Sequence, residues 1–189
     1  PNQLWVADIT YVDTDEGVCY LHLITDAFTH EIIGWVVSDT LLAINTQEAL
    51  EQAICQADAE SLLHLIHHSD RGSQYCCNAY VNRLKEIGAR ISMTEDYKPT
   101  DNAIAERVNG IIKQEWLYRM KRPKNLAALK NIMKGIVKFY NEERLHYSNG
   151  MLTPKAMREA LFGGFTPPAV RQTTVVFFMV LFGRINKKY

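Results

Sequence analysis

Long apolar runs are missing from this 189-residue sequence, and their absence excludes a membrane-spanning helix as its organising feature. No stretch reaches the roughly 18 apolar residues that cross a bilayer as a helix. The apolar segment VVFFMVLF at 175–182 is too short for that role. The first ten residues, PNQLWVADIT, lack a basic segment followed by an apolar one, so we expect no signal peptide there.

Cysteine is also scarce, and its placement excludes a disulfide framework. The four cysteines, at positions 19, 55, 76 and 77, have no metal-binding spacing, and two of them are adjacent. This usage favours a reduced, cytoplasmic chain. With 47% hydrophobic and 22% charged residues, the sequence suits a folded domain with a real core rather than a disordered chain. No internal repeat or low-complexity segment is present.

Basic residues are rare in the first part of the chain and abundant afterwards. Residues 1–106 hold 17 acidic against 5 basic residues, a balance of −12. Residues 107–158 hold 3 against 12, a balance of +9, and residues 159–189 add +3. The net charge of zero therefore hides an acidic half and a basic half. The basic half favours a polyanionic partner such as nucleic acid, but lysine-rich solvated helices would have the same composition.

The hydrophobic pattern predicts a mixed α/β domain. Runs rich in β-branched and aromatic residues predict strands over 4–12, 18–28, 32–38, 62–69 and 90–94. Apolar residues at helical spacing predict helices over 45–57, 77–89, 103–120, 126–143 and 153–162. Short links predict an antiparallel meander for the first three strands. We expect Asn45 to cap the first helix, with Glu48 three residues further on, and Thr153 to cap the last.

The predicted domain covers residues 1–162, with a basic helical part at 107–162. Residues 163–168, GGFTPP, predict a linker, and the tail that ends at residue 189 has no predicted role.

One acidic residue lies where a strand should be buried. Asp8 is in the middle of the first predicted strand, and Asp is disfavoured in strands. An unpaired buried carboxylate is also costly. Few bases are available in this half of the chain, so a metal ion is a more economical partner than an ion pair.

Two further acids occupy positions that suit metal ligands. Asp70 follows the fourth predicted strand, where the carboxyl ends of parallel strands bind ligands, although an Asx turn would also explain it. Glu106 lies in the first turns of a helix whose predicted core stripe is Ile104, Val108, Ile111 and Ile112. At 100° per residue, Glu106 falls opposite that stripe and Lys113 is almost in line with it. Each acid alone fits an ordinary structural role as well.

Taken together, the three acids form a D,D-35-E pattern, with 35 residues between Asp70 and Glu106. The sequence resembles the catalytic core of retroviral-integrase-like transposases encoded by bacterial insertion sequences. The segments that carry the resemblance are WVADITYV, YLHLITDAFTHEIIGW, HHSDRGSQY, SMT, DNAIAERVNGIIKQE and FYNEERLHYSNGMLTP. They follow one another in order over roughly residues 4–160.

The resemblance implies a ribonuclease-H-like fold, which is a five-stranded mixed sheet flanked by helices, with a basic helical extension. It also implies a polynucleotidyl transferase that cuts DNA and joins a 3′-hydroxyl end during transposition. Asp8, Asp70 and Glu106 would be the catalytic residues and the ligands of two Mg²⁺ or Mn²⁺ ions. Carboxylates are the hard oxygen ligands that these ions prefer. Asp8 would contact both ions, and the other two acids would each favour one.

The resemblance also implies partners and supporting residues. DNA would be the substrate, and the chain would act as a homo-oligomer. The candidate DNA-binding residues are Lys113, Arg107, Lys121, Arg122 and Lys124. Possible supporting residues are His68, Arg71, Gln74, Asn102, Asn141, Arg144 and His146. Relatives usually carry an N-terminal helix-turn-helix region that recognises the ends of the element, and nothing in this sequence precedes Pro1.

Two alternatives remain open from the sequence, and a third is disfavoured by its spacing. A plain ribonuclease H would share the fold, but it would show a fourth clustered carboxylate and no basic extension. A non-catalytic DNA-binding remnant of a transposase would keep the basic part. A zinc site made of His67, His68, Cys76 and Cys77 fits no common zinc spacing.

Overall fold

The computed structural model describes residues 1–94 and 102–162. Its strands are β1 (Leu4–Thr14), β2 (Gly17–Asp26), β3 (Ile32–Ser38), β4 (Ile66–Ser69) and β5 (Arg90–Met93). Its helices are α1 (Ala43–Gln56), α2 (Ala59–Leu62), α3 (Ser73–Cys76), α4 (Asn78–Glu86), α5 (Ala103–Ile112), α6 (Leu126–Glu142) and α7 (Pro154–Phe162), with the π-helical turn η2 (Lys113–Leu117) and the 3₁₀ turn η3 (Tyr147–Asn149). The predicted linker and tail lie outside the described residues.

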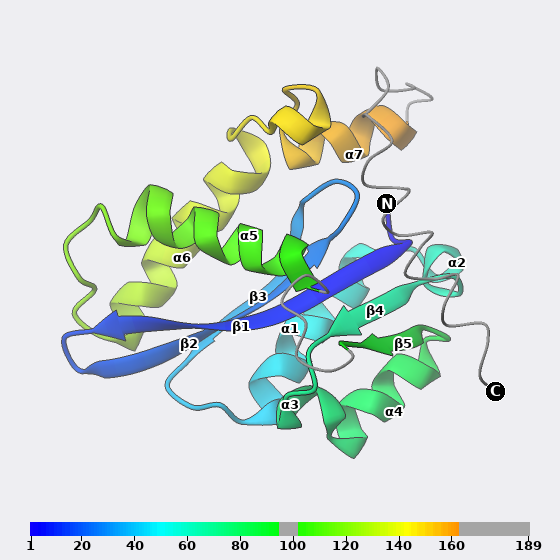
Figure 1. The fold of residues 1–189 in the computed structure, drawn as a ribbon, viewed down its shortest axis with the longest axis horizontal. Helices are drawn as coiled ribbons and strands as arrows, with labels where there is room; N and C mark the ends of the chain where they lie inside the picture. The colour runs from blue at the N-terminus through cyan, green and yellow to red at the C-terminus, as the bar shows by residue number, and fades with distance from the viewer. Residues whose placement is uncertain (95–101, 163–189) are drawn as a thin grey trace.

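The five strands form one mixed sheet in the order β3-β2-β1-β4-β5 (Figure 1). The first three pair antiparallel as a meander. The fourth strand pairs parallel with β1 on one side and with β5 on the other. The predicted five-stranded mixed sheet is therefore confirmed.

Helices cover both faces of the sheet, and each face has its own apolar core. On one face, Trp5 and Ile24 pack with Leu50 of α1 and Leu84 of α4. On the other face, residues of β2 and β3 pack with Val108 and Ile112 of α5 and with the buried side of α6. Alternation along β1 points Trp5 and Ala7 into the first core and sends Asp8 to the α5 side. Figure 1 shows α5 lying across β1.

A glycine allows the close approach of α1 to the sheet. A Cβ added at Gly34 of β3 would overlap the carbonyl oxygen of Ala49 in α1. The neighbouring backbone is held by the same helix, because Trp35 N–H donates to Gln52 Oε1 at 3.1 Å. Gln56 Nε2 also donates to the carbonyl of Ile33 at 2.6 Å. Side chains of α1 therefore cover part of the outer edge of β3.

Several predicted boundaries differ from the observed elements. The first helix begins at Ala43, and Asn45 does not cap it; the Asn45 amide donates to the Thr40 carbonyl at 3.0 Å instead. The run 62–69 is a strand only from Ile66, because a short helix capped by Asp58 precedes it. The helix expected over 103–120 is α-helical to Ile112 and then continues as η2.

Two other helix predictions match the structure more closely. The segment 77–89 contains α4, which is followed by Gly88 at a φ of 77°. Thr153 caps the last helix as predicted, because its Oγ1 accepts from Ala156 N–H at 3.1 Å. Among the described residues, none of the helices has the length and apolar character needed to cross a membrane.

Candidate catalytic site

Parallel pairing of β1 with β4 brings the first two acids together. Leu4, Trp5 and Val6 pair with Ile66, His67 and His68. The same register continued by two residues puts Asp70 opposite Asp8. Asp8 is half-buried in the middle of β1, whereas Asp70 is exposed directly after β4. The predicted neighbourhood of these two carboxylates follows from this register.

Two asparagines fasten α5 to the strand that carries Asp8. Asn102 Nδ2 donates to the carbonyl of Ala7 at 3.1 Å. Asn109 Nδ2 donates to Asp8 Oδ2 at 2.7 Å. Both asparagines are buried although they are polar. They fix the height and rotation of α5 over β1.

The buried face of α5 differs from the predicted stripe. The buried residues are Ala105, Val108, Asn109 and Ile112, whereas Ile104 and Ile111 are only half-buried. At 100° per residue the buried face is therefore turned by roughly 60° from the predicted one. Glu106 consequently lies on the flank of the buried face, beside Asn102 and Asn109, rather than opposite it. The apolar periodicity missed Asn109 because it treats asparagine as a surface residue.

The three acids interact through their charges. Burial raises the pKa of Asp8 from 3.8 to about 6. Hydrogen bonds from the Asn109 side chain and the Ile9 N–H oppose this shift, and the charges of Asp70 and Glu106 add to it. Ile9 N–H donates to Asp8 Oδ1 at 2.9 Å, so both oxygens of Asp8 are held. A site with excess negative charge and hard oxygen donors suits a divalent cation.

The carboxylates do not form a closed metal site in this structure. Within residues 1–94 and 102–162, no three acidic, histidine or cysteine side chains converge closely enough to hold a metal ion. Glu106 is exposed, so its side chain has room to turn towards the two aspartates. The donor types and the charge of the three acids fit Mg²⁺ or Mn²⁺, and Glu106 of α5 would have to turn towards the aspartates to share an ion with them.

The loop after Asp70 is held by its own polar groups. Gly72 N–H donates to Asp70 Oδ1 at 2.9 Å, which is the Asx-type contact that the sequence left open. Arg71 Nε donates to the carbonyl of Thr94 at 2.9 Å, and Gln74 Nε2 donates to that of Leu41 at 3.0 Å. Arg71 and Gln74 therefore support the loop that follows Asp70.

The two histidines before Asp70 have structural partners. His67 is fully buried, its Nε2 lies 2.9 Å from the Tyr80 hydroxyl, and burial lowers its pKa to about 3. His68 Nδ1 lies 2.9 Å from the Ser92 hydroxyl on the neighbouring β5. Cys76 contacts the Arg71 carbonyl and the Met93 sulfur rather than a histidine. These contacts give the four residues no common centre, so the zinc alternative receives no support.

The predicted DNA-binding residues fall in three places. Lys113 begins η2, seven residues or about two turns beyond Glu106. Arg107 is exposed on α5 and lies near His30, whose pKa is lowered chiefly by burial and further by the Arg107 charge. Lys121, Arg122 and Lys124 are exposed in the loop before α6. That loop contacts the tip of the β1–β2 hairpin, where Asp15 N–H donates to the Pro123 carbonyl at 3.0 Å.

Asn141 closes the outer edge of the sheet. Its Oδ1 accepts from Ile32 N–H at 3.0 Å, and its Nδ2 donates to the Ile32 carbonyl at 2.9 Å. One side chain thus imitates an adjacent strand at the start of β3. This contact gives Asn141 a structural role, which the sequence could not assign.

Arg144 and His146 also hold helices together. Arg144 makes a two-pronged ion pair with Glu115 of η2, with Nε at 2.8 Å from Oε2 and Nη2 at 2.5 Å from Oε1. His146 is buried, stacks on His30 and meets the Tyr140 ring edge to face. The segment FYNEERLH therefore joins the end of α6 to η2 and to the β2–β3 turn.

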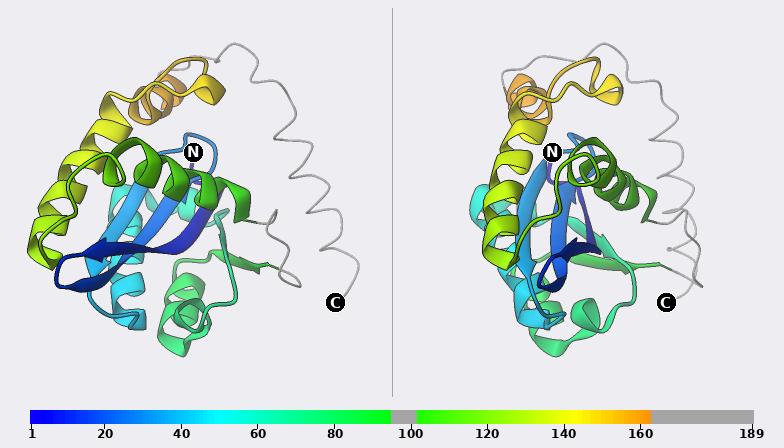
Figure 2. Two further views of the ribbon diagram at one scale, coloured as in Figure 1. Left: turned by 60° about the vertical axis from the view of Figure 1, so that its left-hand side comes forward. Right: turned by 90° about the vertical axis from the view of Figure 1, so that its left-hand side faces the viewer.

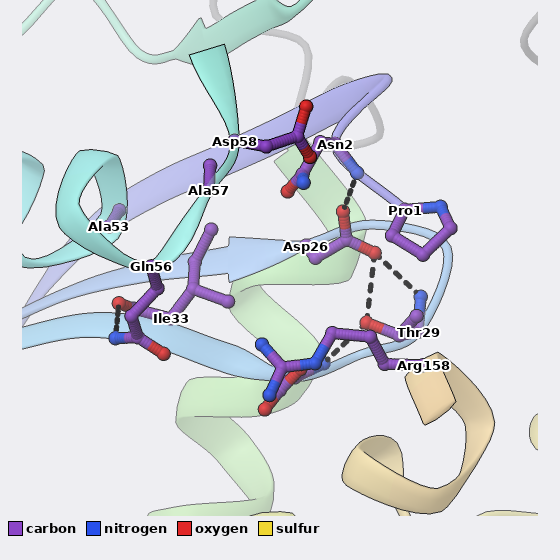
Figure 3. A pocket seen from close by; sticks show the side chains of 11 residues that line it. Pro1, Asn2, Asp26, Thr29, Ile33, Ala53, Gln56, Ala57, Asp58 and Arg158 are labelled. Carbon is purple, nitrogen blue, oxygen red and sulfur yellow. Dashed lines mark hydrogen bonds and ion pairs between the residues drawn. The ribbon is translucent and has the colours of Figure 1, made fainter. Parts of the chain in front are cut away.

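A small polar hollow lies near the N-terminal end of β1, where Pro1 and Asn2 help to line it (Figure 3). Asp26, Glu31, Gln56 and Arg158 are among the residues that line it. Asp26 is satisfied within the fold, because it accepts from the backbone of Asn2 and Thr29 and from the Thr29 hydroxyl. Arg158 Nε lies 3.1 Å from Glu31 Oε2. The residues around the hollow therefore mainly hold α7 against the β2–β3 turn.

The sheet order and the carboxylates on its adjacent strands β1 and β4 define a ribonuclease-H-like domain of the integrase type. The chain belongs to the integrase core domain family. A sequence profile with the description "Integrase core domain" matches residues 1–99, and a second profile with the same description matches residues 87–154.

Similar sequences come from bacterial insertion sequences. The transposase for insertion sequence element IS629 of Shigella sonnei is 40% identical over 162 residues, which are 86% of this chain and 53% of the relative. The transposase for IS904 of Lactococcus lactis is 32% identical over 155 residues, or 82% of this chain and 60% of the relative. A relative from IS986/IS6110 of Mycobacterium tuberculosis, 37% identical, is covered to 62%. The chain thus spans between about half and three fifths of these relatives.

Retroviral integrase cores have the same fold. The HTLV-2 integrase catalytic core domain in complex with magnesium has a TM-score of 0.62 and 21% identity, covering 83% of this chain and 96% of that one. The catalytic core domain of BIV integrase has a TM-score of 0.62 and 18% identity, covering 88% and 100%. At these identities the likeness establishes the fold.

Proposed function

We propose that this chain is the catalytic core of an insertion-sequence transposase, which cuts DNA strands and joins a 3′-hydroxyl end to target DNA. The observation that carries the proposal is the parallel pairing of β1, which holds Asp8, with β4, which ends just before Asp70; the charges of Asp70 and Glu106 both add to the raised pKa of Asp8. The family membership and the relatives from insertion sequences support the same reaction.

In this proposal Asp8, Asp70 and Glu106 hold divalent Mg²⁺ or Mn²⁺. When bound, a pair of such ions would activate the attacking oxygen and stabilise the leaving oxygen of an in-line displacement at phosphorus. Asn109 orients the Asp8 carboxylate, and the Gly72 N–H holds one oxygen of Asp70. Lys113, which follows Glu106 along the helix, would contact a phosphate near the reacting strand.

The proposal extends to the partners of the chain. DNA would be bound in part by Arg107, Lys121, Arg122 and Lys124, with an affinity that falls as salt rises. We propose that the active form is a homo-oligomer that holds two DNA ends. We also propose that recognition of the element ends resides in a separate N-terminal region.

The test is a cleavage and strand-transfer assay with oligonucleotides copied from the DNA that flanks this gene, in Mg²⁺ and in Mn²⁺. Asp70→Asn should reduce both reactions by at least about 10³-fold, because a neutral amide is a poor ligand for a hard cation. Thermal unfolding of the variant should stay within a few degrees of the wild type, since Asp70 is exposed.

Asp39→Asn is the matched control, because Asp39 is an exposed acid at the end of β3, two strands away from β1. It should keep wild-type cleavage. Full activity of Asp70→Asn would show that the site is assigned wrongly. A wild-type chain that binds DNA but never cuts it would instead identify a non-catalytic remnant.

A further inference from the structure

Most bases at 107–158 make no ion pair with the residues that the structure describes. Of the twelve Lys and Arg residues at 107–158, three make ion pairs within the part of the chain that the structure describes. Those pairs join Arg144 to Glu115, Lys155 to Glu142 and Arg158 to Glu31. The other bases therefore leave uncompensated positive charge on the surface.

Three of these bases form a row on α6, which we call the α6 lysine stripe: Lys130, Lys134 and Lys138. All three are exposed. Their spacing of four residues puts one lysine on each successive turn, and the row is about 12 Å long at a rise of about 1.5 Å per residue. This length matches the axial rise of between about three and four base pairs of duplex DNA.

The stripe lies on the flank of α6 that is turned away from α5. The buried side of α6 includes Leu129, Met133 and Tyr140. Phe139 meets Trp116 of η2 edge to face, so the flank that carries Phe139 faces the α5–η2 helix. At 100° per residue, Lys134 is about 140° from Phe139 around the helix. The stripe therefore lies on a different side of the domain from Glu106.

The helix that carries the stripe runs along one side of the molecule, from the β1–β2 hairpin to α7 (Figure 2). Lys130 lies near the start of β2, because its charge opposes the burial that raises the pKa of Cys19. The stripe is thus on the helix that packs on β3, whereas the carboxylates lie on β1, directly after β4 and on α5.

The loop before α6 lies beside the acidic tip of the β1–β2 hairpin, whereas the acids near the stripe include Glu142 and Asp39; the charge of Asp39, like that of Lys130, acts on the pKa of Cys19. Glu16 Oε1 at the hairpin tip accepts from Asn125 Nδ2 at 3.3 Å, and Asp15 N–H donates to the carbonyl of Pro123 at 3.0 Å. Beside the stripe, Glu142 is already paired with Lys155 at 3.0 Å, and Lys138 adds a smaller interaction with it. The stripe therefore keeps most of its positive charge.

We propose that the α6 lysine stripe binds the sugar–phosphate backbone of duplex DNA at a surface separate from the carboxylate site. The proposal rests on the transposase function above, which supplies duplex DNA as the polyanion. Lysine is a compact point charge without the fork that reads base edges, so binding here would be independent of sequence. A row of three apolar residues would suit a protein partner. Burying three lysines without ion-pair partners in a dry protein–protein interface would instead cost free energy.

A footprint on the intact chain tests the proposal directly. The wild-type chain is treated with an amine-reactive reagent, with and without saturating random-sequence duplex DNA of about 30 base pairs, and each lysine is quantified by mass spectrometry. DNA should slow the modification of Lys130, Lys134 and Lys138 several-fold. Lys85, an exposed lysine of α4 on the other face of the sheet, serves as the internal control. Equal modification of the stripe with and without DNA would overturn the proposal.

A charge-removal variant gives an independent readout. Lys130→Gln/Lys134→Gln/Lys138→Gln should reduce the slope of log affinity against log salt concentration by about 2 to 3, at about 0.9 per lost phosphate contact. Lys85→Gln should leave the slope as it is. An unchanged slope in the folded triple variant counts against the stripe. The stripe could also be protected without DNA at high protein concentration. If sedimentation then shows dimers, the partner of the stripe is a second copy of the chain and the DNA proposal is wrong.

The two proposals can fail separately. Asp70→Asn should lose cleavage and keep the DNA footprint on the stripe. Wild-type cleavage without a footprint contradicts the stripe alone. A footprint without any cleavage by the wild type supports the stripe and contradicts the transposase proposal.

Discussion

Asn109 shows how one buried polar side chain can organise a charged site. Its amide holds Asp8 Oδ2 at 2.7 Å, and the backbone N–H of Ile9 holds the other oxygen. The carboxylate is thereby fixed in a direction that would suit the cation proposed above. Fixed ligands bind metals more tightly, because less freedom is lost on binding.

We therefore predict that Asn109→Ala weakens binding of Mn²⁺ by about 10- to 100-fold, the usual effect of removing a residue that orients a metal ligand. Isothermal titration of the full chain with Mn²⁺ measures this change. Asn131→Ala is the matched control, because Asn131 is exposed on α6. Equal affinities of Asn109→Ala and the wild type would show that Asn109 serves α5 packing alone.

Helices α1 and α5, whose first turns have no side-chain cap, and the end of α6 are positioned by close contacts with the sheet. Helix α1 lies on Gly34, α5 is fastened to β1 by Asn102 and Asn109, and the end of α6 is fastened to β3 by Asn141. Side-chain amides of α1 and α6 also cover the outer edge of β3. An edge covered in this way is less open to pairing with another chain.

Gly34→Ala should destabilise the domain, because the new methyl group would overlap the Ala49 carbonyl and force α1 away from β3. We expect a loss of about 1–3 kcal/mol in the free energy of unfolding, the usual effect of overpacking a core. Urea denaturation followed by circular dichroism measures it.

Gly135→Ala is the opposite case and serves as the control. Nothing lies within 4 Å of a Cβ at this exposed position of α6. Alanine favours helices over glycine by about 1 kcal/mol, so this variant should be slightly more stable than the wild type. Destabilisation of both variants by the same amount would mean that the contact with Ala49 is not the cause.

The pH dependence of stability belongs to the fold as a whole, because buried groups titrate in opposite directions. Burial lowers the pKa of His22 and His146 to about 4 and that of His67 to about 3. The unfolded chain therefore binds more protons between these values and about 6.5, so the histidines destabilise the fold as pH falls through that range. We expect acid unfolding to begin below about pH 6.

Glu31 acts in the other direction. Burial raises its pKa from 4.5 to about 7, and the attraction of Arg158 only partly offsets that shift. The folded chain thus holds the proton more tightly, and stability from this group falls as pH rises from about 4.5 to about 7. The free energy of unfolding of Glu31→Gln should be close to that of the wild type at pH 4.5. Towards pH 8 it should exceed the wild-type value by roughly 2–3 kcal/mol.

Urea denaturation at a series of pH values measures this difference, with the exposed Glu48→Gln of α1 as the matched control. A difference between Glu31→Gln and the wild type that stays constant with pH would show that Glu31 is charged throughout. In that case Arg158 would outweigh the effect of burial.

Much of the fold could be predicted because its strands are nearly continuous apolar segments. Residues 32–38 were predicted with the observed bounds of β3, and the short links correctly indicated the meander. Helix ends were predicted less well. Asn45 donates to the Thr40 carbonyl instead of capping α1, whereas Asp58 caps α2 by accepting from Ser61 N–H, and the local sequence favours either role for both residues.

The D,D-35-E spacing and the shift from acidic to basic residues were readable from the linear chain, because spacing and net charge need no tertiary information. They predicted the family and named Asp8, Asp70 and Glu106. Three-dimensional packing settled which polar residues are buried, and hence that Asn109 holds Asp8, that Asn141 completes the edge of β3, and that Glu106 lies on a flank of α5. Those contacts join residues about a hundred positions apart, and a periodic pattern records only the neighbours within one helix or strand.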